Sequence, residues 1–420
     1  MNFLNKPLSA PSHIVEYLIG LILLFFPSLL FLVRGGMNAS LFLLVIISAF
    51  LLVAYRKSSW HKLDRTNILF AAAMASGLLV ILISQLYQHD LRGRYFDSSA
   101  RFLLGIPVLL VLRNIGMKSL SVVQYAFPLG AISALVAVLI EDPSVRINAA
   151  TFYLNHIHLG DMALLLGVLS LLSINWVGSD NLILKLLKVT GFIAGLFVSA
   201  ISSARGGWIA IPIFVGVYLY IQNKENFVRR FGVATLLLGV VGLFAYLFVE
   251  PIHHRLWMIY SDLLHFGSGN MDTSIGVRFQ LWKAAFHLIA ENPMLGMGAE
   301  GFARSMDALS ASGFITPVAA ELGKGEVHNE ILAQTVRFGV FGLASILAVY
   351  FVPFYLFVRA IKTGSSQQVG AAMMGMCVTL GFFIFGLTVE IFNLKMTVAF
   401  YSLTVTVLLA IATHHSAPSN

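Results

Sequence analysis

The chain has 420 residues, of which 58% are hydrophobic and only 11% are charged. Soluble domains carry about 45–50% apolar and about 25% charged residues, so this composition excludes a water-soluble fold and requires a lipid bilayer as the solvent. The net charge of +8 is better explained by basic residues that anchor a membrane protein on its cytoplasmic side than by a nucleic-acid partner.

Twelve apolar stretches approach the length of about 20 residues that a transmembrane helix needs. The sequence therefore predicts an all-α polytopic membrane protein with about 12 transmembrane helices. The stretches lie near 13–33, 37–55, 67–88, 101–113, 121–140, 158–176, 181–203, 206–222, 231–250, 329–358, 368–390 and 394–413.

Lysine and arginine are unevenly distributed over the segments between these stretches. With the N-terminus in the cytoplasm, the inner segments carry 14 of them and the short outer segments carry 7. Cytoplasmic loops are enriched in positive charge, so we expect both termini on that side. The chain then divides into transmembrane helices 1–9 (residues 1–250), a periplasmic loop (251–327) and transmembrane helices 10–12 (328–420), within a single integrated domain.

The long outer loop has a helical pattern of its own. Apolar residues recur at helical spacing in 253–266 and 277–290, which predicts two amphipathic helices that lie on the membrane surface or over the helix bundle. Asn292-Pro293 ends the second of them. We expect function to concentrate on this loop and on the short outer loops around it.

One histidine, His328, stands where the long loop enters the tenth span. The partial positive charge of a helix N-terminus disfavours a protonated imidazole, so we expect His328 to be neutral near pH 7, which is the state that a general base requires. The alternative is a wetted interfacial histidine without a catalytic role.

Two arginines of the outer face are candidates for binding an anion. Arg205 lies in a short hairpin between apolar spans, where a charge near lipid is costly and often functional, and Gly206-Gly207 permits close approach of a ligand to the backbone. Arg278 opens the second amphipathic helix, where its charge opposes the helix dipole unless an anion lies nearby. The alternatives are snorkelling to lipid headgroups for Arg205 and a solvated helix face for Arg278.

Further polar residues of the outer face are candidate substrate contacts. For His158 and Asp161, at the start of the sixth span, the alternative is helix capping. For Glu390, in the last outer hairpin, it is a structural ion pair. Arg92 and Arg94, in the second outer loop, suit contacts with an anionic acceptor, and their alternative is simple solvation.

At these residues the chain resembles the O-antigen ligase/polymerase family of bacterial inner-membrane glycosyltransferases, and most closely the lipopolysaccharide O-antigen ligases. The layout is similar, with about twelve spans and one large loop before the third-last span. The matching segments, in chain order, are Ser203-Ala-Arg-Gly-Gly207, residues 278–282 continuing through 291–298, and His328-Asn-Glu-Ile-Leu332 followed by Gly339-Val-Phe-Gly342.

The resemblance implies transfer of a polysaccharide from undecaprenyl diphosphate to a sugar hydroxyl of lipid A-core, at the periplasmic face of the bacterial inner membrane. In this chemistry, we hypothesise His328 as the base, Arg205 and Arg278 as ligands of the diphosphate, and Asn329 as a further substrate contact. Direct attack would invert the anomeric centre. The expected partners are the lipid-linked donor, lipid A-core and membrane lipids.

No metal or cofactor is expected. The sequence contains no Asp-x-Asp pair of the kind that holds a divalent ion on a nucleotide sugar, and no His/Cys cluster at zinc spacing. Two alternative functions remain open at this stage. One is polymerisation of O-antigen units on the same donor, and the other is transport of a lipid-linked glycan.

Overall fold

The computed structural model describes residues 11–56, 60, 63–141, 154–202, 205–248 and 271–414, together with the single positions 250, 253, 257, 260, 261 and 264. Over these residues every regular element is a helix. The predicted all-α class is therefore confirmed.

Each of the twelve predicted spans corresponds to a helix. Among the described residues, ten helices are long and apolar enough to cross a membrane, and two shorter apolar helices complete the set, so the chain is a multi-pass membrane protein. The long helices are α1 (His13–Leu32), α2 (Gly36–Ala54), α3 (Arg65–Tyr87), α4 (Phe96–Leu112, preceded by η2, Gly93–Tyr95), α6 (Val123–Ile140, preceded by α5, Met117–Leu120), α9 (Leu182–Ile201), α11 (Phe227–Phe248), α16 (Glu330–Ile361), α17 (Ser366–Phe385) and α18 (Lys395–Ala412), and the shorter ones are α8 (His156–Leu172) and α10 (Ala210–Gln222).

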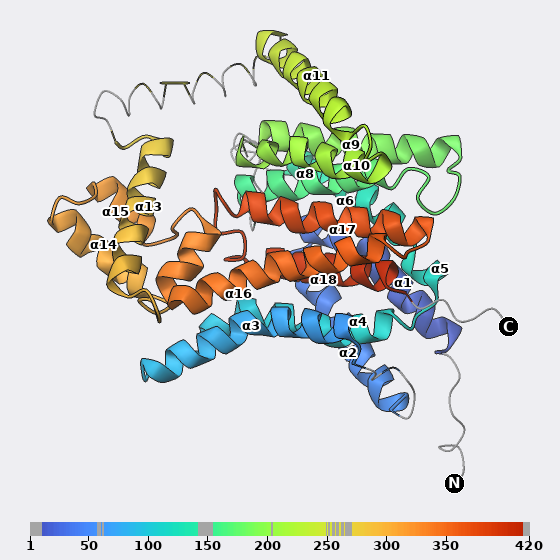
Figure 1. Ribbon diagram of the computed structural model, residues 1–420, viewed down its shortest axis with the longest axis horizontal. Helices are drawn as coiled ribbons and strands as arrows, with labels where there is room; N and C mark the ends of the chain where they lie inside the picture. The colour runs from blue at the N-terminus through green and yellow to red at the C-terminus, as the bar shows by residue number, and fades with distance from the viewer. Residues whose placement is uncertain are drawn as a thin grey trace.

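The last helix lies at the centre of the bundle. α18 is buried along almost its whole length and packs against α2, α4, α16 and α17. A second group, α1, α6, α8 and α9, packs alongside. Gly195 of α9 lies against Gly167 of α8, so two small residues let these helices approach closely. α11 buries no residue and lies at the edge of the bundle, where it contacts α10 (Figure 1).

The loop between α11 and α16 folds into a unit of three helices at one end of the bundle (Figure 1). We call this end of the bundle the loop end. The predicted amphipathic helix at 277–290 is confirmed as α13 (Ser274–Glu291), whereas most of the predicted 253–266 helix lies outside the described residues. Two further helices, α14 (Gly301–Ala311) and α15 (Pro317–Gly323), were not predicted.

These three helices share a small hydrophobic core with the beginning of α16. Leu281 and Leu288 of α13, Phe302 and Met306 of α14, and Val336 of α16 are all buried in it. At about 25 cal/mol per Å² of buried apolar surface, such a cluster anchors the loop helices firmly. The apolar stripe of α13 therefore faces protein rather than the membrane surface.

The long helix α16 is broken at Gly339, whose φ of 62° and ψ of −150° are not helical. The segment that follows α13 lies in the break. The amides of Met297 and Gly298 donate to the carbonyls of Val336 and Arg337 at 2.8 Å each, and the amide of Val340 donates to the carbonyl of Pro293 at 2.9 Å. The exchange satisfies backbone groups that a broken helix would leave unpaired.

The opposite end of the bundle carries both the start of α1 and the end of α18. Glu16 of α1 accepts from the amide of Gly116 at 3.4 Å, and His414, just after α18, contacts the carbonyl of Ile115 at 2.9 Å. Arg113, beside these residues, pairs with Asp64 at 2.8 Å. The first and last described helices therefore meet at the end away from the loop.

Candidate functional site

His328 lies in the turn that leads into α16, at the loop end. The next residue, Asn329, caps the helix by accepting from the amide of Leu332 at 3.0 Å, and its side-chain amide donates to the carbonyl of Leu387 at 3.2 Å. His328 itself has a φ of 58°, a left-handed conformation that is uncommon outside glycine. Its carbonyl accepts from the indole N–H of Trp282 on α13 at 3.3 Å.

The imidazole of His328 is in contact with a carboxylate. Nδ1 lies 2.6 Å from Oε1 of Glu326, and both side chains are largely buried, with 17% and 22% of their surface exposed. Oε2 of Glu326 accepts from the amide of Glu390 at 3.4 Å. Burial acts to raise the pKa of Glu326, but its interactions with the nearby imidazole of His328 outweigh burial and hold this pKa below the ordinary value.

A buried ion pair supports this turn from the hairpin between α17 and α18. Glu390, only 1% exposed, accepts hydrogen bonds from the two terminal guanidinium nitrogens of Arg337, Nη1 at 2.7 Å and Nη2 at 3.1 Å. Its Oε1 also accepts from the amide of Val327 at 2.6 Å. Both carboxylate oxygens of Glu390 thus have partners within the protein.

His158 and Asp161 begin α8 beside the same turn. Nδ1 of His158 lies 2.7 Å from Oδ1 of Asn155, which also caps the helix through the amide of His158. His158 is within electrostatic reach of Glu326. Asp161 is completely buried, and neither of its carboxylate oxygens has a hydrogen-bond partner. An unpaired buried carboxyl is costly, so a structural capping role does not account for Asp161.

The hairpin that carries Arg205 folds as a short helix, η3 (Arg205–Ile209), against α8 and α17. A Cβ atom on Gly206 would meet Thr388, and one on Gly207 would meet Oδ1 of Asp161. The glycines are therefore required because this backbone packs directly on the start of α8 and on the residues that follow α17. The side chain of Arg205 lies outside the described set.

Arg278 lies one helical turn before Trp282 on α13. Residues four apart share one face of a helix, and the indole of Trp282 bonds the backbone of His328. The structure therefore brings the Arg278 segment to the turn of His328. Arg278 is partly exposed and has an interaction partner in the protein.

Arg92 and Arg94 occupy a different position, in the hairpin between α3 and α4. Both pair with Glu300, which precedes α14: Arg92 lies 3.4 Å from its Oε2, and Arg94 contacts its Oε1. Arg92 also pairs with Asp90 at 2.8 Å. The two arginines thus tie the α3–α4 hairpin to the loop helices. Because acidic residues already pair with both arginines, the structure does not decide between contact with an anionic acceptor and simple solvation.

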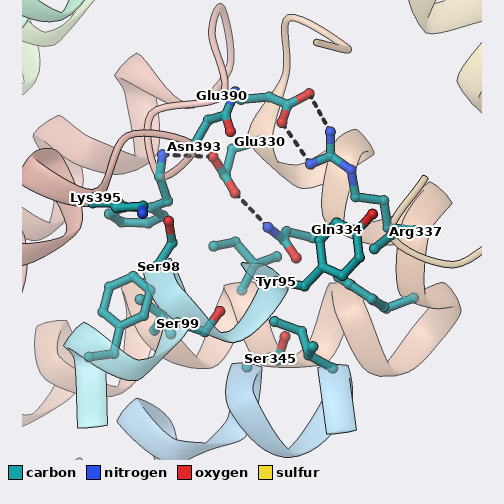
Figure 2. Close-up of a pocket in the computed structure, with 18 of the residues that line it drawn as sticks. Tyr95, Ser98, Ser99, Glu330, Gln334, Arg337, Ser345, Glu390, Asn393 and Lys395 are labelled. Atoms are coloured by element: carbon teal, nitrogen blue, oxygen red, sulfur yellow. Dashed lines mark hydrogen bonds and ion pairs between the residues drawn. The ribbon is translucent and has the colours of Figure 1, made fainter. Parts of the chain in front are cut away.

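A pocket of about 410 Å³ opens beside this tie, between α3, α4, α16 and α18 (Figure 2). In Figure 2 the charged and amide side chains lie in the upper part of the pocket, and Ser99 and Ser345 lie below them. The buried carboxylate of Glu330 accepts from Gln334 at 2.8 Å and from the amide of Phe392 at 3.0 Å. The labelled polar residues that line the pocket are Tyr95, Ser98, Ser99, Glu330, Gln334, Arg337, Ser345, Glu390, Asn393 and Lys395.

Sequence reasoning selected segments that the structure brings together, but it missed several of their charged partners. The structure gathers His328, Asn329, His158, Asp161 and Glu390 with the backbone of the Arg205 hairpin at one end of the bundle. It adds Glu326, Glu330, Arg337 and Glu300, none of which was a candidate. The spacing Glu-x-His at 326–328 was the one available signal for Glu326, because side chains two residues apart in an extended turn can lie on the same side and contact each other.

Within the described ranges, no group of three or more His, Cys, Asp or Glu side chains is arranged to hold a metal ion. The expected independence of metals and cofactors stays a prediction.

Comparisons with known proteins cover most of the chain. A family model described as O-antigen ligase matches residues 190–347. A protein of Haemophilus influenzae described as uncharacterized is 27% identical over 366 residues, which is 84% of this chain and 88% of that protein. An O-antigen ligase of Escherichia coli is 22% identical over 371 residues, 84% of this chain and 85% of that protein. The matched segment 190–347 includes Arg205, Arg278 and the His328 turn.

Proposed function

Because the chain is related to the O-antigen ligase family through residues 190–347, we propose that it is a glycosyltransferase of O-antigen assembly. In this proposal it transfers polysaccharide from undecaprenyl diphosphate to a sugar hydroxyl of lipid A-core, at the periplasmic face of the inner membrane. The observation that carries the proposal is the contact of His328 with Glu326, at the end of the bundle that also holds the Arg205 and Arg278 segments.

The proposed reaction is a direct displacement at the anomeric carbon of the donor glycan. His328 removes the proton of the acceptor hydroxyl as its oxygen attacks that carbon. The bond to the diphosphate breaks, and Arg205 and Arg278 stabilise the charge that develops on it. One displacement inverts the anomeric configuration. The proton ends on His328, and undecaprenyl diphosphate leaves.

The placement of charge favours an enzyme over a transporter. A transporter binds its cargo near the middle of the membrane, on broken or charged helices. Here the break in α16 at Gly339 is filled by protein backbone, and the candidate residues gather at the loop end. Polymerisation would use the same donor and base with a second lipid-linked glycan as acceptor, so the acceptor is what an experiment has to identify.

The direct test is transfer in vitro. Purified protein in lipid nanodiscs is mixed with undecaprenyl-diphosphate glycan and lipid A-core, without added metal or ATP, and glycosylated lipid A-core is measured. We expect product from the wild-type protein and none from His328→Ala. The matched control is His287→Ala, an exposed histidine of α13, which should retain wild-type rates. Full activity of His328→Ala would refute the assignment of the base.

The diphosphate ligands are tested in the same assay. The double variant Arg205→Gln/Arg278→Gln should lose donor turnover by a factor of 10² or more, since charge stabilisation of a leaving group is commonly of that order. Arg229→Gln/Arg230→Gln removes two exposed arginines at the start of α11 and is the control. Equal loss in both double variants would contradict a specific role at the diphosphate.

A deletion strain separates ligation from polymerisation. A ligase mutant accumulates long-chain glycan on the lipid carrier while its lipid A-core stays bare. A polymerase mutant makes lipid A-core that carries a single repeat. We expect the first phenotype.

A further inference from the structure

We propose that Glu326 is a positioning residue for His328: its carboxylate keeps the proton of the imidazole on Nδ1 and so leaves Nε2 as the basic nitrogen for the acceptor hydroxyl. The catalytic part of this inference rests on the proposed function, in which His328 is the base. The position of the proton is a property of the protein alone.

The close approach of a carboxylate favours a proton on Nδ1, because two lone pairs would repel at this distance, although the contact does not have the angle of a regular hydrogen bond. Nδ1 of His328 lies 2.6 Å from Oε1 of Glu326, and an ionised carboxylate can only accept a hydrogen bond. A neutral imidazole carries its proton on one nitrogen, and the partner of that nitrogen decides which one it is. Glu326 therefore selects the Nδ1–H form.

The backbone around His328 holds the ring in place. The amide of Val327 donates to Glu390 at 2.6 Å, the carbonyl of His328 accepts from Trp282 at 3.3 Å, and the amide of Glu330 donates to the carbonyl of Gly386 at 2.7 Å. Residues 327, 328 and 330 of one turn are thus tied to α13 and to the segment between α17 and α18. The left-handed φ of 58° at His328 persists because these contacts over-determine it, as is common where a functional group must be held.

The charges that face Glu326 leave its carboxylate available for this role. On α16, Arg337 is bound by Glu390 through two contacts. On α8, His158 is nearly fully buried, and its Nδ1 contacts Oδ1 of Asn155. From the hairpin between α17 and α18, the amide of Glu390 reaches Oε2 of Glu326. Oε1 is the oxygen left to His328.

This arrangement has a chemical consequence. When Nε2 takes the proton of the acceptor hydroxyl, His328 becomes an imidazolium with Glu326 as its counter-ion. In the Ser-His-Asp triad the carboxylate has the same effect, because it holds the tautomer and stabilises the imidazolium without taking the proton. Loss of Glu326 should therefore slow the chemical step more than it weakens donor binding.

The first experiment observes the proton without using activity. Protein labelled with ¹⁵N-histidine is examined by NMR at a pH at which imidazoles are neutral, and the signal of His328 among the 12 histidines is assigned by its loss in His328→Gln. We expect a protonated Nδ1 in the wild-type protein and a shift toward protonated Nε2 in Glu326→Ala. A wild-type His328 protonated on Nε2, or a signal unchanged in Glu326→Ala, would overturn the proposal.

The second experiment measures its catalytic effect. In the transfer assay, Glu326→Gln should lower kcat by roughly 10²–10⁴-fold, the upper value being that of the comparable triad substitution, with the donor KM unchanged. The acidic limb of its pH–rate profile should move to lower pH, because the imidazolium has lost its counter-ion. Glu326→Asp should restore part of the rate.

The control is Glu321→Gln, a carboxylate of α15 that is 77% exposed and should behave as wild type. A merely structural role would lower the melting temperature of Glu326→Gln and raise KM while leaving the pH profile in place, which would refute the positioning role. If the wild-type protein transfers no glycan, the proposed function fails, and the NMR result still decides where the proton of His328 lies.

Discussion

The carboxylate of Asp161 occupies the space into which a side chain on Gly207 would point. The Arg205 hairpin can therefore lie on the start of α8 only with glycine at that position. Asp161 has no other partner, so the hairpin and the buried carboxyl share one close contact.

Gly207→Ala should displace this hairpin. The added methyl group has no room, and overpacking typically costs about 1–3 kcal/mol. We expect a lower melting temperature in detergent and a loss of transfer that exceeds the loss of stability, because Arg205 moves with the backbone. Gly232→Ala, on α11, is the control: a Cβ there meets nothing within 4 Å. Similar losses in both variants would show that the effect is not local to the hairpin.

Arg337→Ala tests the buried ion pair beneath His328. The substitution leaves Glu390, which is 1% exposed, without its counter-ion, whereas Arg337 itself is 21% exposed. Breaking a buried pair costs about 3–5 kcal/mol, and the partial exposure of Arg337 places the expected cost near the lower value. Arg94→Ala breaks a pair whose arginine is 61% exposed and should cost at most about 1 kcal/mol. Chemical unfolding in mixed micelles compares the two, and equal costs would contradict the buried character of the Arg337 pair.

The break in α16 makes a third prediction. An alanine at position 339 would have to adopt a φ of 62°, and its Cβ would collide with the carbonyl of Met294. Such backbone conformations cost about 1–3 kcal/mol each in a residue other than glycine. Gly339→Ala should therefore release the 293–298 segment from α16. Hydrogen exchange at the amides of Met297 and Gly298 should rise, with Gly242→Ala on α11 as the unaffected control.

The spans could be predicted because a bilayer imposes a length and a composition on each of them. The twelve apolar stretches correspond to helices even where Pro107 lies inside one. The loop was harder, since its helices are short and pack on each other. α14 packs through Phe302 and Met306 on α13 and α16. The helical spacing of Phe302, Met306 and Leu309 was a local signal for α14 that the sequence prediction did not use.

The site was predictable in its segments and not in its partners. His328 and Arg205 attract notice because a polar residue next to an apolar span is conspicuous. Glu326 and Arg337 do not, because each looks like an ordinary charge of an outer loop or a helix face. Their roles depend on contacts with residues far away in the chain, such as Glu390, and a single sequence does not reveal such pairs.

The tie between Glu300 and the α3–α4 hairpin should loosen when its charge is removed. The hydrogen bond from Tyr95 and the charges of Arg94 and Arg92 hold the pKa of Glu300 below its ordinary value. In Glu300→Gln we expect faster hydrogen exchange over residues 88–95, which border the pocket, and the same change in wild-type protein at high salt because exposed pairs are screened. Glu321→Gln should leave this exchange unchanged. Exchange that does not respond to salt would mean that the tie is not electrostatic.

The lowered pKa of Glu326 predicts a dependence of stability on pH. Its folded-state pKa lies below the ordinary value of 4.5, because the contact with His328 outweighs the effect of burial. The carboxylate therefore stabilises the folded site above pH 4.5, and this contribution is lost as the pH falls below 4.5 through the lower folded-state pKa. Melting temperatures between pH 7 and pH 3.5 should fall less steeply for Glu326→Gln than for wild-type protein, while Glu321→Gln should follow the wild-type curve. Parallel curves for Glu326→Gln and wild-type protein would show that Glu326 is not ionised against His328 in the folded state.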